Sequence, residues 1–286
     1  MPELPEVETV RRGLEPVLVG ARLARVEARR PDLRFPLPAR FAERLTGARV
    51  EALGRRAKYL LARLDTGETL VAHLGMSGRF LIEGAERSAP GAFRNWSPTD
   101  DKHAHIQFET DAGARITYFD ARRFGYMDLI ATAGIEDCRW FKDLGPEPLG
   151  EDFDAARLAE AFKGKAQNVK VTLLDQRIVA GLGNIYVCEA LHRAKIAPAT
   201  AAGRVSARRL GGLVEAVKAV LTEAIAAGGS TLRDYAAADG ALGYFQHAFQ
   251  VYGREHEPCL RAGCRGVVRR TVQAGRSSFF CPVCQT

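Results

Sequence analysis

Apolar residues recur at helical spacing near the start of the chain. Val7, Val10 and Leu14 fall on one face of a 3.6-residue repeat, and Val17 continues that face one turn later. The spacing predicts an amphipathic helix that begins near Pro5.

Short apolar segments bounded by Gly, Asp or Asn follow, from about residue 22 to residue 119. Such segments are typical of strands and turns. The alternation is clearest in residues 102–108, where it predicts that His103, His105 and Gln107 share the face opposite the apolar side chains. One helix followed by a run of strands predicts a β-sandwich or barrel with a leading helix.

The pattern becomes helical again after residues 144–150, whose two prolines and two glycines indicate a linker. Asp154 is placed to cap a short helix that ends at Phe162, and Ser206 is placed to cap a longer helix that ends before Gly228. Beyond it, the Gly-, Ala- and Asp-rich residues 230–245 predict a long loop, of a kind that is usually functional or disordered.

The composition adds a positive charge to this picture. The chain has 286 residues, of which 47% are hydrophobic, and a net charge of +7. The charge favours a polyanionic partner, with nucleic acid ahead of a membrane surface, although solubility alone also accounts for it. The sequence shows no basic segment at its start and no apolar run near the ~20 residues of a membrane span, so we expect a cytoplasmic protein without a membrane partner.

Four of the six cysteines lie in the last 28 residues, as two closely spaced pairs that are sixteen residues apart. This arrangement is typical of a tetrahedral four-thiolate site, so we favour one structural zinc ion over disulfides or chance. The insert between the pairs predicts a hairpin with strands at 267–272 and 278–280. Cys138 and Cys188 stand alone and are expected to be small buried apolar residues. The four candidate zinc ligands are Cys259, Cys264, Cys281 and Cys284.

The same terminal segment is rich in arginine. Residues 247–286 contain six arginines and no lysine. Because guanidinium groups bind phosphate in a bidentate manner, this composition favours contact with a nucleic-acid backbone. Arg276 lies at the tip of the predicted hairpin, where it would reach furthest, and an ordinary surface arginine is the alternative.

The first residues of the chain offer a candidate nucleophile. Removal of Met1 would leave Pro2 with a free secondary amine, and an α-amino group has a pKa near ~8, so much of it is unprotonated at neutral pH. Such an amine forms an imine at a sugar C1′ or a carbonyl carbon, and Glu3 is placed to move the protons. The alternative is that a small residue at position 2 only permits removal of Met1 and that Pro-Glu opens the helix.

Eight short motifs are spread along the chain. They are PELPEVET at 2–9, RAKYLL at 56–61, HLGMSG at 73–78, DARRFG at 120–125, GLGNIY at 181–186, GSTLRD at 229–234, GRS at 275–277 and CPVCQ at 281–285. Through these motifs the sequence resembles, over essentially its whole length, the formamidopyrimidine-DNA glycosylase family, bacterial base-excision enzymes for oxidised purines. One departure is visible, because the first zinc pair is usually separated by two residues and is here separated by four.

The resemblance implies a bifunctional enzyme that removes 8-oxoguanine and formamidopyrimidines from duplex DNA and then cleaves the strand by β,δ-elimination. Pro2 would attack C1′ of the damaged nucleoside and form a Schiff base, with Glu3 as the proton shuttle. Lys58, on a strand that faces the N-terminus, would assist base release and β-elimination. Arg276 would hold a phosphate and assist δ-elimination. From its sequence neighbours alone, Lys58 is an ordinary strand residue.

The resemblance also implies how DNA is held. Excision requires the base to leave the stack, and Met76, Arg122 and Phe124 would fill the gap. Met76 lies in a turn between two glycines, which favours a projecting tip over a core position. Asn184 would close the turn of a helix–two-turn–helix element and hold backbone phosphate. Three further positions match DNA-contacting residues of the family, namely His103, Lys165 and Lys170.

The implied fold is α+β and multidomain. It comprises an N-terminal catalytic β-sandwich with a leading helix in residues 1–145, a helix–two-turn–helix domain with a lesion-recognition loop in 146–246, and a zinc-finger β-hairpin in 247–286. The expected partner is damaged double-stranded DNA, bound by a monomer in the bacterial cytoplasm, at the nucleoid.

Two other functions stay open. An endonuclease VIII-like glycosylase would remove oxidised pyrimidines with the same fold, and Leu4 and the long 229–245 loop argue against it. A non-catalytic zinc-ribbon DNA-binding protein would need only the basic finger, and the joint presence of Pro2, Glu3 and Lys58 argues against that.

Overall fold

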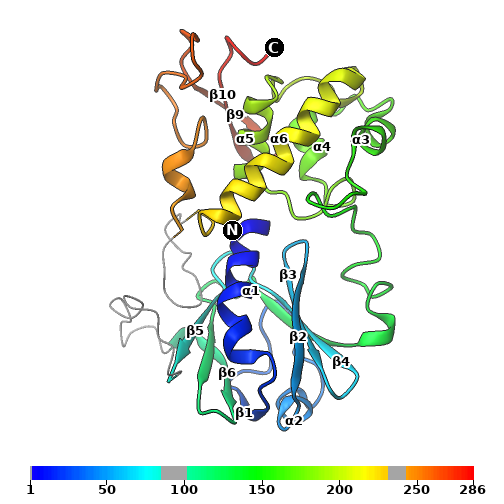
Figure 1. Cartoon of the computed structure of the whole chain (residues 1–286), viewed down its shortest axis with the longest axis vertical. Coiled ribbons are helices and arrows are strands. Elements are labelled where there is room, and N and C mark those ends of the chain that lie inside the picture. Colours follow the sequence, from blue (N-terminus) through cyan, green and yellow to red (C-terminus); the bar gives the residue numbers. More distant parts are fainter. Residues whose placement is uncertain (1, 85–101, 231–242) are drawn as a thin grey trace. The chain divides into compact units, whose positions relative to one another are not determined.

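The computed structural model describes residues 2–84, 102–230 and 243–286 of the chain (Figure 1). Their internal contacts define two compact units. We call Met1–Lys142 with Ala227–Tyr244 the N-terminal unit, and Asp143–Ala226 with Phe245–Thr286 the C-terminal unit. The division into three domains at residues 145 and 246 stays a prediction.

The N-terminal unit is a β-sandwich with a leading helix, as the hydrophobic pattern predicts. Helix α1 (Leu4–Leu18) comes first and packs on one of two antiparallel sheets. That sheet has the order β2 (Val50–Arg56), β3 (Tyr59–Leu64), β4 (Glu68–His73) and β8 (Tyr126–Ala131). The other has the order β1 (Leu23–Ala28), β6 (Ala104–Thr110), β7 (Arg115–Phe119) and β5 (Arg79–Glu83).

Apolar side chains from both sheets and from α1 form one hydrophobic core. The buried positions of α1 include the predicted Val7, Val10 and Leu14. A short helix α2 (Phe41–Leu45) packs on β1, and the 3-10 turn η2 (Thr132–Gly134) follows β8.

The predicted facing of β6 is wrong at His105. The strand has an irregularity in its pairing with β7 between Ala104 and Ile106, which breaks the alternation. His105 is therefore buried, and its ring Nε2 lies 2.9 Å from the carbonyl oxygen of Asp120, to which it donates. Burial lowers the pKa of His105, so the neutral ring is favoured here.

The C-terminal unit is helical and ends in a hairpin. Asp154 caps α3 by accepting a hydrogen bond from the backbone N–H of Arg157 at 2.7 Å, as predicted. The carbonyl of Ser206 accepts the first helical hydrogen bond of α6, from Leu210. The elements in order are α3 (Ala155–Phe162), α4 (Val169–Leu174), α5 (Asn184–Arg193), η3 (Ala202–Arg204), α6 (Ala207–Ala226), η4 (Phe245–Ala248), β9 (Arg269–Gln273) and β10 (Arg276–Phe280).

Helix α5 lies at the centre of this unit and packs on α4, α6 and β10. Its Glu189 is fully buried and accepts hydrogen bonds from the backbone N–H groups of Gln250, Val251 and Tyr252 at 2.8–3.0 Å. Burial raises the pKa of Glu189, and the three N–H donors oppose that rise. This carboxylate ties the segment that leads to the hairpin onto α5.

Most of the predicted 230–245 loop lies outside the described residues, which stop at Ser230 and resume at Gly243. In the part of the chain that is described, no helix combines the length and the apolar character that crossing a membrane requires.

Candidate functional site: a buried N-terminal proline, two paired turns and a four-cysteine centre

The N-terminal peptide is buried and held by Glu6. Pro2 and Glu3 directly precede α1, and both are buried. The backbone N–H of Glu3 donates to Oε2 of Glu6 at 2.8 Å. The same carboxylate accepts from the backbone N–H and the hydroxyl of Ser230, at 2.8 and 3.0 Å. Glu6 therefore fixes both the candidate catalytic peptide and the start of the 230–245 loop.

Lys58 lies in a turn, and the prediction of a strand position is wrong. Ala57 and Lys58 form the two-residue connection between β2 and β3, and the left-handed φ of 52° at Ala57 closes it. Lys58 is only 7% exposed. Burial, and then the positive charges of Lys58 and Arg34, lower the pKa of His73 to about 3. Lys58 thus lies close to the end of β4.

The three predicted gap-filling residues lie on two turns of the N-terminal unit. Met76 is half-buried in the turn between β4 and β5, whereas Arg122 and Phe124 are exposed in the turn between β7 and β8. Phe124 is 42% exposed, and the Arg122 guanidinium lies 5.0 Å from the centre of its ring. Phe124 is therefore not a core residue, and its exposed ring suits contact with a base.

Asn184 and Lys170 converge on one carbonyl in the C-terminal unit. The Asn184 Nδ2 and the Lys170 Nζ donate to the carbonyl oxygen of Ser277, at 2.9 and 3.1 Å. Lys170 is fully buried, and burial lowers its pKa. Ser277 follows Arg276, which is exposed at the start of β10 beside the turn Ala274-Gly275. The pair therefore positions the strand that carries Arg276.

The remaining predicted DNA contacts are not part of these groups. Lys165 is exposed in the loop between α3 and α4, and His103 is half-buried just before β6. Sequence reasoning also missed Gln176, whose amide braces the turn between α4 and α5 by bonding the carbonyls of Leu174 and Leu182. Nothing in its sequence neighbourhood marks this role, because its partners are backbone groups.

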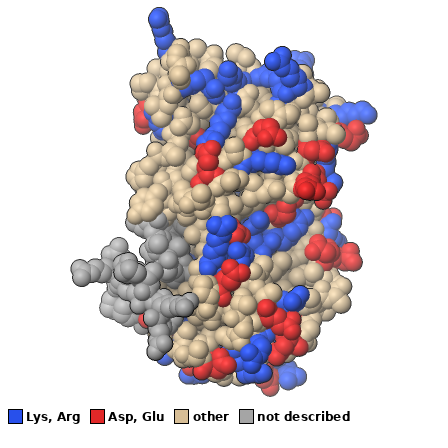
Figure 2. All heavy atoms as spheres, viewed as in Figure 1, with Lys and Arg blue, Asp and Glu red and all other residues tan. Residues whose placement is uncertain are grey.

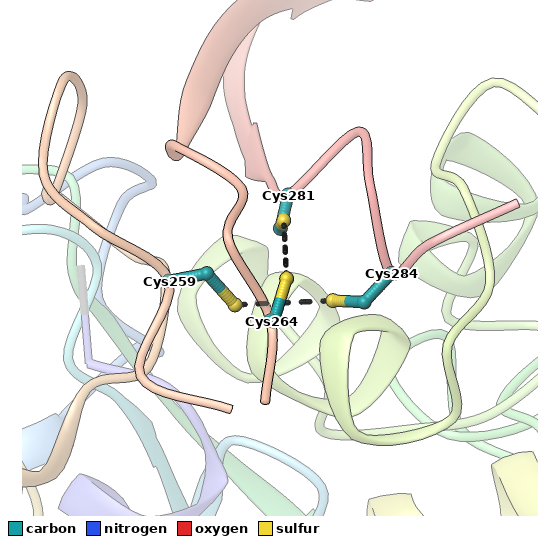
Figure 3. Close-up of side chains that lie close together, drawn as sticks. All are labelled: Cys259, Cys264, Cys281 and Cys284. Atoms are coloured by element: carbon teal, nitrogen blue, oxygen red, sulfur yellow. Dashed lines mark hydrogen bonds between the residues drawn. The ribbon is translucent and has the colours of Figure 1, made fainter. Parts of the chain in front are cut away.

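The four terminal cysteines meet at one point (Figure 3). Their sulfur atoms lie within 4.8 Å of one another. A tetrahedral ion with bonds of about 2.3 Å to sulfur requires sulfur separations of about 3.8 Å. The Sγ atoms of Cys259 and Cys284 are 3.8 Å apart, and those of Cys264 and Cys281 are 3.7 Å apart. The geometry fits one zinc ion, and the chain binds it here as a structural centre.

The wider spacing of the first pair is accommodated by Arg261. The backbone N–H of Cys264 donates to the carbonyl of Arg261 at 3.0 Å, which closes a turn at the end of the four residues that separate the two cysteines. The Arg261 guanidinium donates to the carbonyl of His192 near the end of α5, where a cation is favourable. Leu260 is 56% exposed, so the insert extends outward.

The two lone cysteines differ in exposure. Cys188 is buried and packs with Val251 and Val268, as expected. Cys138 is half-buried in the N-terminal unit, so the expectation of a buried residue is met only in part.

Basic and acidic side chains are interspersed on the face drawn in Figure 2. Although the chain has a net charge of +7, this face shows no single uniform basic patch among the described residues.

Comparison with known proteins gives the family to which these features belong. Three family models match the chain. They are the formamidopyrimidine-DNA glycosylase N-terminal domain at residues 1–127, the formamidopyrimidine-DNA glycosylase H2TH domain at 144–236, and the zinc finger found in FPG and IleRS at 257–286.

Full-length relatives agree with the models. The chain is 67% identical to the formamidopyrimidine-DNA glycosylase of Phenylobacterium zucineum and 64% identical to that of a Caulobacter species, each over 100% of both chains. It matches a Lactococcus lactis FPG mutant bound to Fapy-dG-containing DNA with a TM-score of 0.87 at 36% identity over 100% of both chains. For the MutM (FPG) protein of Thermus thermophilus the TM-score is 0.84 at 38% identity, over 99% of this chain and 98% of that one. The chain belongs to the formamidopyrimidine-DNA glycosylase family.

Proposed function

We propose that this protein excises oxidised purines, namely 8-oxoguanine and formamidopyrimidines, from duplex DNA and then cleaves the strand. The observation that carries the proposal is the buried Pro2-Glu3 peptide at the start of α1, held by the Glu6 carboxylate. A solvated tail would leave its amine hydrated and mobile, whereas a fixed one is ready for attack. Family membership supports the same reaction.

In the proposed chemistry the Pro2 amine, freed by removal of Met1, attacks C1′ of the damaged nucleoside. The bond from nitrogen to C1′ forms as the glycosidic bond breaks, and the base leaves with a proton. Glu3 moves protons while the sugar ring opens to the iminium ion, a Schiff base. The negative charge of Glu3 is favoured at the N-terminus of α1. Loss of the C2′ proton then expels the 3′-phosphate, and a second elimination expels the 5′-phosphate.

The other residues are proposed to hold DNA. Lys58 assists base release and β-elimination, and Arg276 binds a phosphate and assists δ-elimination. Met76, Arg122 and Phe124 fill the gap left by the extruded base. Asn184, His103 and Lys165 contact phosphates, whereas Lys170 contributes from a buried position.

The location of Lys170 shapes its proposed role. Because its ammonium group donates to the Ser277 carbonyl, it acts on DNA mainly by positioning β10 and adding positive charge near Arg276. The zinc ion supports the fold of the segment that presents Arg276 and takes no part in the reaction. The protein is proposed to act as a monomer on damaged duplex DNA in the bacterial cytoplasm.

A panel of duplexes tests the proposed substrate class. Each duplex carries one 8-oxoguanine, one formamidopyrimidine or one oxidised pyrimidine, and base release and strand cleavage are measured under single-turnover conditions. We expect the purine lesions to be excised at least about tenfold faster, a difference of about 1.4 kcal/mol in activation free energy.

The pyrimidine arm has a specific reason, because a 35% identical Lactococcus lactis FPG has been solved with DNA that contains an oxidised pyrimidine. Faster excision of the pyrimidine lesion would favour the endonuclease VIII-like alternative. Tight binding of every duplex without base release would favour the non-catalytic alternative.

A further inference from the structure

A fully buried carboxylate joins the two turns that carry the proposed gap-filling residues. Asp120 follows β7 and has no exposed surface. Its Oδ1 accepts a hydrogen bond from the Ser77 hydroxyl at 2.5 Å, and its Oδ2 accepts from the backbone N–H of Gly125 at 2.7 Å. The Tyr118 hydroxyl lies 3.4 Å from Oδ2 and donates to it. One carboxylate thus binds both turns.

The hydrogen bonds form a chain that reaches the exposed tips. The backbone N–H of Arg122 donates to the Ser77 hydroxyl at 3.0 Å, and that hydroxyl donates to Asp120. Ser77 directly follows Met76, and Gly125 directly follows Phe124. Arg122 therefore takes part in this series of hydrogen bonds directly. Met76 and Phe124 are each adjacent in sequence to a residue that takes part in it.

The two turns are also in direct backbone contact. Gly75 has a φ of +61°, and a Cβ added there would overlap the carbonyl carbon of Phe124 and the nitrogen of Gly125. A Cβ on Gly125 would overlap the Tyr118 hydroxyl and lie 2.9 Å from Oδ2 of Asp120. The interface between the turns therefore leaves no room for a side chain at either glycine.

The buried Asp120 carboxylate beneath the two turns has a mechanical consequence. A residue that fills the place of an extruded base must resist restacking, which is worth a few kcal/mol. Side chains on two independent turns would yield to that force. Hydrogen bonds to a buried carboxylate are roughly twice as strong as neutral ones, so they hold the two turns as one body.

We propose that Asp120, through Ser77, is a positioning residue that locks the Met76 turn and the Arg122–Phe124 turn into a single rigid wedge for base extrusion. The inference rests on the proposed function, because it assigns the support of the residues that fill the gap. Asp120 itself touches neither the DNA nor the reacting atoms.

The test compares two DNAs that differ in the need for extrusion. One is a duplex with a single 8-oxoguanine, and the other is a single strand with a preformed abasic site, whose imine is trapped with borohydride. Asp120→Asn and Ser77→Ala should each slow excision from the duplex by about tenfold or more and change single-strand trapping by less than about twofold. Ser77→Thr keeps the hydroxyl and should restore most of the duplex rate.

Asp128→Asn is the matched control. Asp128 lies on β8 in the same unit and accepts three hydrogen bonds, from Leu129, Arg139 and Trp140. The control should keep the ratio of the two rates found for wild type. If Asp120→Asn does not fold, Ser77→Ala carries the test, because Ser77 is half-buried and removal of its hydroxyl leaves the carboxylate with two donors.

The outcomes separate the two proposals. Wild type that reacts with neither DNA overturns the proposed function and the wedge with it. Wild type that reacts with both, together with Asp120 and Ser77 variants that keep the wild-type ratio, overturns the wedge alone. Equal losses on both DNAs would show a general structural role and would also overturn it.

Discussion

A half-buried histidine, His73, shows how its surroundings set the protonation state of a side chain in the N-terminal unit. Its ring stacks on Tyr126 with centroids 5.0 Å apart and planes 12° apart. Its Nδ1 accepts a hydrogen bond from the backbone N–H of Gly75 at 3.0 Å. Burial, and then Lys58 and Arg34, lower the pKa of His73 to about 3, so the ring is neutral and keeps this acceptor at neutral pH.

This shift predicts a pH dependence of stability. Between pH 6.5 and about 3 the unfolded chain binds a proton on His73 that the folded chain does not, so the free energy of unfolding falls as the pH falls. The slope from this residue is at most about 1.4 kcal/mol per pH unit. His73→Asn keeps an acceptor and does not titrate, so its unfolding free energy should fall less.

Urea unfolding of both proteins at pH 7 and pH 5 measures the effect. Wild type should lose up to about 2 kcal/mol more than His73→Asn between the two pH values. His192, whose pKa burial lowers to about 4, titrates in both proteins and cancels in the difference. Equal losses would show that His73 does not carry the shift.

The sequence identifies candidate site residues, but not the residues that hold them in place. Pro2, Glu3, Arg276 and the cysteines are found from residue type and motif. Glu6 is not found in that way, because its partner Ser230 lies 224 residues away. Asp120 and Glu189 are missed for a related reason, since Glu189 accepts from three backbone N–H groups and Asp120 from one, and no residue type encodes such donors.

Elements were predictable where the signal is local. The spacing of apolar residues locates α1, and an N-capping aspartate locates α3. The two failures both involve backbone irregularities. A break in the β6 pairing accompanies the burial of His105, and a left-handed Ala57 places Lys58 in a turn. Alternation of side chains assumes regular strands, so it does not reveal either feature.

The packing of the four-cysteine centre depends on Gly266. A Cβ on Gly266 would overlap the Sγ of Cys281 and lie 2.9 Å from the Cβ of Val283. Gly266→Ala should therefore displace a zinc ligand. Because zinc provides roughly 10–16 kcal/mol of apparent binding energy in small finger peptides, even partial loss should weaken the segment.

We expect Gly266→Ala to release zinc at lower chelator concentration than wild type, by about tenfold or more. Competition with a chromophoric chelator measures this, and DNA binding should fall in parallel. Gly211→Ala is the control, because a Cβ at this α6 position meets no atom within 4 Å. Unchanged zinc affinity in the Gly266 variant would contradict the packing described for the centre.

The N-terminal unit is not continuous in sequence. Residues 227–244 belong with the N-terminal unit, although they follow the helices of the C-terminal unit in sequence. Sequence pattern places boundaries where composition changes, so it did not predict this return. Hydrogen bonds between Glu6 and Ser230 are among the contacts of the described residues that show it.

Pro2, which becomes the N-terminal residue once Met1 is removed, is proposed to carry out the chemistry. Incubation with a duplex that carries one 8-oxoguanine, in the presence of borohydride, reduces the imine to a stable crosslink. Proteolysis and mass spectrometry then locate the DNA on one peptide. Pro2→Gly, which keeps a free α-amine in a more flexible chain, and Lys58→Met serve as comparison variants.

We expect the wild-type crosslink on the nitrogen of Pro2, in a chain that has lost Met1. It should persist at reduced yield in Lys58→Met. A crosslink on Lys58, or equal trapping in a chain that retains Met1, would show that Pro2 is not the nucleophile.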